Sequence, residues 1–178
     1  AHGPARRIEL EIVLHDDVSK LRATLTYALH TVTDILRVRT TLENIGDRAV
    51  DVQWLAAATL PLPDQCTRVH SWTGQHNEEF VPVVDTLSRS LWRRESRRGR
   101  TSHDCWPGAI AATAGTSRGE GLAYGAHFAW SGNHAQTIEW LHDGTYQWQL
   151  GEWLAPGELE LAPAGSPGAS ITTPEVIA

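Results

Sequence analysis

The residues best suited to chemistry gather in one polar run, from Glu95 to His103. Five arginines lie between positions 93 and 100, beside Glu95 and the hydroxyl and ring donors of Ser102 and His103. A buried guanidinium without a partner costs several kcal/mol, so the run is predicted to stay at the surface. Two interpretations are open. The run is a solvated loop whose arginines pair with nearby acids, or Arg97, Arg98, Ser102 and His103 face the oxygens of a ligand or partner surface.

Other pairings of reactive side chains are poorly suited to catalysis. Ser102 and His103 are neighbours in sequence, and such neighbours rarely meet in the geometry that proton transfer needs. The acidic pairs 16–17 and 78–79 would point to opposite faces of an extended chain, which favours solvated carboxylates over a glycosidase acid and base. The nine histidines show no metal-ligand spacing. The chemistry therefore favours a binding or structural module, with no metal and no cofactor, over a complete enzyme.

Eight tryptophans are unusual for a chain of 178 residues. Indole rings fill protein cores or serve as platforms on which sugar rings stack. Three of them are in phase with apolar neighbours and are predicted to be core, namely Trp54, Trp130 and Trp148. Three others, Trp72, Trp92 and Trp106, keep a second function open, an independent carbohydrate-binding module in which they are the stacking platforms.

Apolar and polar residues alternate along most of the chain, which is the two-residue period of strands with one wet face. Between residues 64 and 90 the alternation is weak, and we expect a long excursion with at most two short strands. Strands at roughly ten-residue spacing, with no convincing helix between them, predict an all-β sandwich. The alternating or apolar stretches are 8–14, 21–29, 36–42, 50–60, 109–114, 122–130, 138–142 and 146–150.

Length and charge limit the class of protein. A chain of 178 residues is expected to form one sandwich domain, over residues 1–178. The net charge of −6 disfavours nucleic acid as the main partner, and no apolar run is long enough to suggest a membrane partner. Cys66 and Cys105 are expected to be free thiols, which together with the lack of a signal peptide suggests a cytoplasmic location. A start at Ala1 without Met indicates a cut inside a longer protein or a processed terminus.

Several short motifs occur in a characteristic order. They are residues 95–99, then 101–103 with Pro107, then 131–133, 156–158 and 173–175. Their order and spacing resemble the N-terminal domain of family 36 glycoside hydrolases, the bacterial and fungal α-galactosidases. The likeness extends from about Ile8 to Ala178. The chain differs from the family's usual pattern at 71–75 and at 104–106, where Asp104-Cys105-Trp106 replaces the common Gln-His-Asn.

The resemblance implies a fold, a parent activity and partners. The fold is a galactose-mutarotase-like β-supersandwich of mostly antiparallel strands, placed before a catalytic (β/α)₈ barrel that this chain lacks. Because the family's two catalytic aspartates lie on that barrel, no residue here is expected to be catalytic. The parent protein would be a retaining α-galactosidase, and the expected partners are its own barrel, an α-galactoside and further copies in a homo-oligomer. The resemblance also implies that the chain starts after the first strands of the family's domain, which leaves exposed sheet edges.

The candidate residues for a substrate cleft or an interface are Trp72, Arg97, Arg98, Ser102, His103, Trp106 and Asn133. In this interpretation the arginine-rich loop is ordered against the barrel or its substrate cleft. A third possibility is a stand-alone sugar epimerase of the mutarotase type. That activity needs a His and a Glu that converge in a concave sheet, and no histidine is marked out by its neighbours in the sequence.

Overall fold

The computed structural model describes residues 7–100 and 104–178 of the chain. Ser102 and His103, predicted as site residues, therefore lie outside the described residues. Within the described ranges the chain forms strands joined by turns, with no helix and hence none that could span a membrane. The strands are β1 (Arg7–Asp16), β2 (Leu21–His30), β3 (Ile35–Asn44), β4 (Val50–Asp51), β5 (Trp54–Leu62), β6 (Cys66–Gln75), β7 (Glu78–Thr86), β8 (Trp92–Ser96), β9 (Gly108–Thr113), β10 (Ala123–Phe128), β11 (His134–Trp140), β12 (Tyr146–Trp153), β13 (Glu160–Leu161), β14 (Ser170–Thr172) and β15 (Val176–Ile177).

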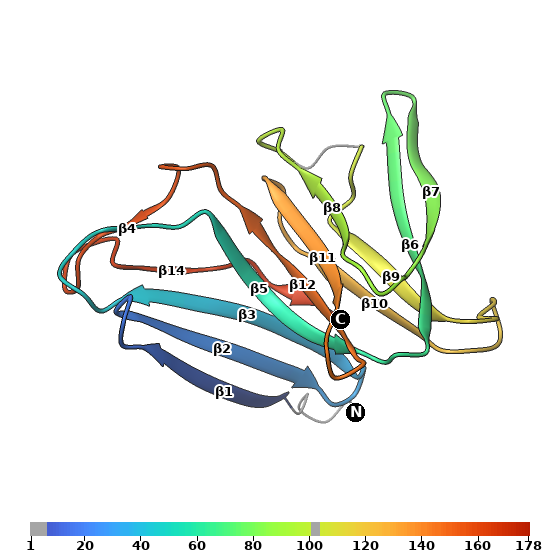
Figure 1. Ribbon diagram of the computed structural model, residues 1–178, viewed down its shortest axis with the longest axis horizontal. Helices are drawn as coiled ribbons and strands as arrows, with labels where there is room; N and C mark the ends of the chain where they lie inside the picture. Colours follow the sequence, from blue (N-terminus) through green and yellow to red (C-terminus); the bar gives the residue numbers. More distant parts are fainter. Residues whose placement is uncertain (1–6, 101–103) are drawn as a thin grey trace, which may run out of the picture.

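The strands form two main antiparallel sheets that pack on each other (Figure 1). The larger sheet has the order β1-β2-β3-β15-β10-β9-β6-β7, and β14 also pairs with β3. The smaller sheet has the order β5-β12-β11-β8, and β13 pairs with β4 in a short ribbon. This architecture confirms the predicted all-β sandwich of antiparallel strands.

The core lies between the two sheets. The larger sheet contributes Val38, Val69 and Phe128, and the smaller sheet contributes Ile138 and Trp148. Each of these side chains is at most 1% exposed. Because burial of one such side chain is worth about 1.5–3 kcal/mol, this cluster holds the sheets together and fixes the strands that carry the candidate site.

Strands β1 to β3 form as their alternation predicts, yet β1 is left largely uncovered. Ile8, Leu10, Ile12 and Leu14 share one face of β1 and are 40–60% exposed. We call this row the open apolar face. Since its neighbours across the ladder on β2 are also apolar, the core face of the large sheet continues past the area that the smaller sheet covers (Figure 1).

The segment 64–90 is more regular than its sequence suggests. It folds into a long hairpin of β6 and β7, with ten and nine residues, rather than two short strands in an excursion. The hairpin projects beyond the rest of the molecule (Figure 1). Most residues of β7 are exposed on both faces of the strand. Its sequence therefore does not need to alternate between apolar and polar residues.

The prediction that Trp54 is core is wrong because β5 contains a bulge. Ala56 and Ala58 pair with successive residues of β12, which leaves Ala57 as an extra residue between them. Ala57 and Ala58 both face the core and are at most 1% exposed. Since side chains alternate with a period of two, the extra residue moves Trp54 to the outer face of the small sheet.

Trp130 and Trp148, also predicted to be core, have different outcomes. Trp148 is 1% exposed and lies at the centre of the core, as expected. Trp130 is 39% exposed, so the prediction for it is wrong. The reason is that β10 ends at Phe128, and Trp130 lies in the turn beyond the ladder, where alternation no longer determines burial.

Candidate functional site

A cleft lined largely by polar residues lies between the projecting hairpin β6–β7 and the strand β8. Its volume is about 270 Å³. One wall comes from the hairpin and the other from β8 together with Asp104 and Cys105. The lining residues are Ser71, Trp72, Thr73, Val83, Arg93, Arg94, Glu95, Asp104 and Cys105.

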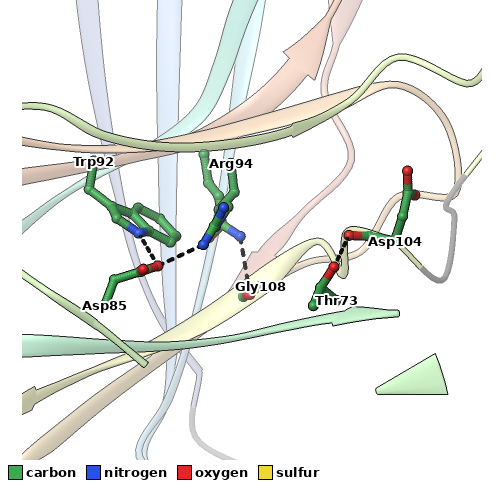
Figure 2. Close-up of polar contacts among 7 residues, drawn as sticks. Thr73, Asp85, Trp92, Arg94, Asp104 and Gly108 are labelled. Carbon is green, nitrogen blue, oxygen red and sulfur yellow. Dashed lines mark hydrogen bonds and ion pairs between the residues drawn. The ribbon is translucent and has the colours of Figure 1, made fainter. Parts of the chain in front are cut away.

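An acidic residue of β7 ties the hairpin to β8. Asp85 accepts a hydrogen bond of 2.8 Å from Trp92 Nε1 and an ion-pair contact of 2.8 Å from Arg94 Nη2. Figure 2 shows Trp92 and Arg94 pointing from β8 toward Asp85. Trp92 also packs against the core, so it is not a free platform for sugar stacking. The contact fixes the width of the cleft and holds one guanidinium at its wall.

The loop after β8 is fastened to the hairpin and to the turn before β11. Arg98 Nε lies 2.7 Å from a carboxylate oxygen of Asp104, whose backbone carbonyl accepts a hydrogen bond of 2.9 Å from Thr73 Oγ1. The Gly99 amide donates to Asn133 Oδ1 at 2.7 Å. Of the predicted site residues, Arg98 and Asn133 therefore act on the same loop. The contact between Thr73 and Asp104, drawn in Figure 2, completes its attachment.

Trp72 and Trp106, predicted as site residues, pack on each other beside the outer half of the hairpin, where Trp72 pairs with Pro82. Their ring centroids are 5.2 Å apart in an edge-to-face arrangement. The Trp106 ring also lies 4.8 Å from the ring of His127, whose pKa is lowered by burial. Because Trp106 is enclosed by these rings, only Trp72 of this pair lines the cleft.

Arg97 is placed away from the other predicted residues. Its Nε lies 2.7 Å from Glu95, which also binds Arg93, and its guanidinium lies 4.1 Å from the ring centroid of Trp153. Burial is the largest influence on Glu95 and raises its pKa. The hydrogen bonds and charges of Arg93 and Arg97 together outweigh burial, so the pKa of Glu95 is lowered overall. These contacts lie on the outer face of the small sheet.

Cys105 and His134 meet beside the cleft, with Sγ 3.6 Å from Nε2. Burial, with a smaller contribution from the charge of Asp104, raises the pKa of the Cys105 thiol to about 11, and burial also lowers the pKa of His134. A protonated thiol beside a neutral imidazole is a poor nucleophile at neutral pH. Both Cys105 and Cys66 are free thiols, as expected, and both are buried.

An epimerase of the mutarotase type needs a His and a Glu that converge, and His134 and Glu152 form such a neighbouring pair. They lie opposite each other on β11 and β12, and their exposed fractions are 1% and 8%. Burial raises the pKa of Glu152, and the charge of Glu158 adds to the effect. Because both side chains are enclosed between the sheets, a sugar has no access to them.

Several residues of this region had no signal in the sequence. Asp85 and Asp104 contact partners that lie across a sheet or far along the chain, and Arg94 was noticed only as one of five arginines, without its partner Asp85. Trp153 is one of eight tryptophans, and its position relative to its apolar neighbours did not single it out. For Asp104, its position inside a motif that departs from the family pattern was the one available hint.

The chain was compared with known protein families and with curated proteins. The family model described as the glycosyl hydrolase family 36 N-terminal domain matches residues 5–162. The chain is 33% identical over 152 residues to an α-galactosidase of Escherichia coli. This match covers 85% of this chain and 21% of that protein. It is 32% identical over 168 residues to the bifunctional α-galactosidase/sucrose kinase of Mediterraneibacter gnavus. This match covers 94% of this chain and 18% of that protein. The chain thus spans about a fifth of the length of these relatives.

Solved structures show the same relationship. The galactosidase domain of an α-galactosidase-sucrose kinase matches with a TM-score of 0.85 at 29% identity, over 96% of this chain and 23% of that one. A variant of the α-galactosidase AgaA of Geobacillus stearothermophilus, solved in complex with raffinose, matches with a TM-score of 0.83 at 26% identity, again over 96% and 23%. Because both its sequence and its sandwich fold match those of this family, the chain belongs to the N-terminal domain family of the family 36 glycosyl hydrolases.

Proposed function

We propose that this chain is the larger part of the N-terminal sandwich domain of a longer α-galactosidase-like glycosidase. In this role it supports the catalytic barrel and the assembly of an oligomer, and it does not hydrolyse glycosides by itself. The observation that carries the proposal is the family match over residues 5–162, combined with the small share of the α-galactosidases that the chain spans.

The open apolar face on β1 supports the structural part of the proposal. Leu10 and Leu14 are 56% and 54% exposed within a continuous apolar ladder. A contiguous apolar surface of this kind typically marks an interaction site. At about 25 cal/mol per Å² of apolar area removed from water, covering it with another domain or subunit would stabilise the assembly.

The cleft beside β8 supports a role at the rim of a substrate cleft. Arg94 and Trp72 offer a charged donor and an aromatic ring to the same space. Such a combination suits a sugar, which presents hydroxyl groups at its edge and C–H bonds on its face. The parent's substrate would be an α-galactoside, as in the relatives named above. The carboxylates near this cleft, Asp85 and Glu95, are bound to arginines and serve positioning rather than proton transfer.

The structural role is tested by two neighbouring substitutions on β1 in the full-length gene product. Ile12→Glu places a charge on the open apolar face, and Val13→Glu places the same charge on the opposite face of the same strand. Both residues are exposed and aliphatic, at 40% and 51%. Light scattering, thermal melting and turnover of a chromogenic α-galactoside are then measured. Ile12→Glu is expected to weaken assembly or lower the melting temperature while Val13→Glu does not. Equal behaviour of the two variants would refute the proposed support role.

A further inference from the structure

The outer face of the small sheet carries a groove separate from the cleft described above. Its volume is about 390 Å³, which is within the range of roughly 300–1,000 Å³ typical of ligand pockets. Its lining includes at least one residue from each of the four strands. The lining residues are Gln53, Trp54, Leu91, Arg93, Thr137, Glu139, Gln149 and Trp153.

Two tryptophans form the aromatic side of this groove. Trp54 and Trp153 are directly paired across β5 and β12, and both line the groove. The bulge at Ala57 is what turns Trp54 outward beside its partner. The guanidinium of Arg97 lies 4.1 Å from the Trp153 ring centroid, so it covers one side of that ring and restrains its orientation. A restrained aromatic ring is a better platform than a mobile one because less entropy is lost on binding.

Polar side chains form the other side. Gln149 on β12, Thr137 on β11 and Arg93 on β8 occupy one straight row across the sheet. The Gln149 side chain reaches Thr59 at 3.4 Å, which orients its amide. Amides and hydroxyls both donate and accept hydrogen bonds, and sugar hydroxyls do the same.

Small residues separate the aromatic row from the polar row. Gly151 and Ala135 are paired with each other between these rows, and Ala56 is the next residue on β5. Because residues on one face of a strand are spaced by about 7 Å, the two rows lie roughly 13 Å apart along the strands. Ala135 is 2% exposed and Gly151 is also buried, so neighbouring side chains lie over this middle row.

The charges at the end of the groove are already balanced. Arg93 and Arg97 both bind Glu95, which lies between them on β8. Glu95 offsets one of these two positive charges, and Glu139 in the lining supplies a second negative charge, so these four groups sum to zero. The groove thus suits a ligand that is neutral, rich in hydroxyl groups and able to stack.

We infer that this groove is a binding site for a neutral oligosaccharide, with Trp54 and Trp153 as stacking platforms and Gln149 and Thr137 as hydrogen-bonding groups. The aliphatic C–H bonds on one face of a pyranose ring meet the negative face of an indole, and its hydroxyls reach the polar row. This site uses other residues than the tryptophans expected from the sequence, and it does not depend on a catalytic barrel.

The site is tested by titrating the full chain with two neutral tetrasaccharides, stachyose and maltotetraose. The indole N–H signals of the eight tryptophans are followed by two-dimensional ¹H–¹⁵N NMR and assigned by single substitutions. Binding of either sugar in the roughly millimolar range, with the shifts concentrated on Trp54 and Trp153, is the expected result. Shifts confined to Trp72 and Trp106 would overturn the inference, as would the absence of binding to both sugars.

Substitutions provide the second arm of the test. Trp153→Ala and Gln149→Ala are each expected to weaken binding, by roughly tenfold or more for the tryptophan. Trp130→Ala is the matched control because it removes an exposed tryptophan outside the groove. The remaining indole signals and the melting temperature report whether each variant is folded. Unchanged affinity in folded Trp153→Ala and Gln149→Ala would overturn the inference. If no sugar binds and these two substitutions instead abolish assembly of the full-length gene product, the inference is overturned and the groove is a protein interface.

Discussion

The molecule contains two tryptophan pairs that have different neighbours. Trp72 and Trp106 meet edge to face beside the outer half of the hairpin, and Trp106 also packs against His127. Trp54 and Trp153 lie side by side on the outer face of the small sheet, and both border an open groove. All four rings are partly buried, but the first pair is ring on ring with a third ring beside it, and the second lies flanking a groove.

The difference shows that strand register, and not residue type, decides which face of a sheet a tryptophan occupies here. One extra residue in β5 converts Trp54 from a core position to a surface position. The bulge is accommodated by Gly151, because a Cβ there would lie 2.1 Å from the Leu55 carbonyl oxygen. If the comparison is correct, substitutions near the bulge should disturb both packing and groove, whereas substitutions of exposed groove residues should disturb binding alone.

The largest effect is expected for Gly151→Ala. The added methyl group would collide with the backbone of Leu55 and Ala56, which cannot move without breaking the β5–β12 ladder. We expect a loss of more than about 3 kcal/mol in the free energy of unfolding, measured by chemical denaturation. Gly125→Ala is the matched control, since Gly125 is also a strand glycine and its added Cβ would meet nothing closer than 3.8 Å. Similar losses in both variants would disprove the role of the bulge.

The next effect compares the two pairs directly. Trp106→Ala should cost about 2–3 kcal/mol, because the ring packs on Trp72, on His127 and over Gly108. Trp54→Ala should cost about 1 kcal/mol, because its ring is partly solvated at the groove. Thermal melting of both variants gives the order. If Trp54→Ala were the more damaging, the outer pair would be structural and the contrast would fail.

A pH-dependent effect is expected from Glu152, which is enclosed beneath the outer face. Burial raises its pKa in the folded state above the value in the unfolded chain, so stability is lost as the pH rises from the unfolded-state pKa through the folded-state pKa. Glu152→Gln should therefore stabilise the protein near pH 7 by about 0.5–2 kcal/mol and give little gain near pH 4. Melting curves at both pH values test this, with the exposed Glu160→Gln as control. A gain that is equal at both pH values would contradict the assignment.

The smallest effect on stability is expected for Arg97→Ala. Its side chain is 52% exposed, and exposed ion pairs and cation–π contacts contribute about 1 kcal/mol or less. The variant should melt within a few degrees of the parent, but saccharide affinity should change because Trp153 loses its restraint. A large drop in melting temperature with unchanged affinity would place Arg97 in the fold rather than at the groove.

Much of the fold follows from the sequence because most strands have one wet and one dry face. The alternation through β1, β2 and β3 predicts those strands closely, because apolar residues recur at every second position, even in β1, which is exposed along its whole length. The hairpin β6–β7 was missed because it projects from the molecule and β7 is exposed on both faces. The outward position of Trp54 was missed because a bulge changes parity without leaving a local signal.

The candidate site was less predictable than the fold. Resemblance to the family drew attention to Arg98 and Asn133, and the structure brings both to the loop that follows β8. The partners that hold this loop, Thr73 and Asp104, come from pairings across more than one strand, which single-sequence patterns do not encode. The groove bordered by Trp54 and Trp153 depends on strand order, which alternation alone leaves undetermined.

The central proposal, that this chain is a non-catalytic domain of an α-galactosidase-like enzyme, is tested most directly by one activity measurement. Hydrolysis of a chromogenic α-galactoside is measured for the 178-residue chain and for the full-length gene product at equal molar concentration. The proposal predicts turnover by the full-length product and none by the chain. Turnover by the chain itself would contradict it and would place a catalytic site within these residues.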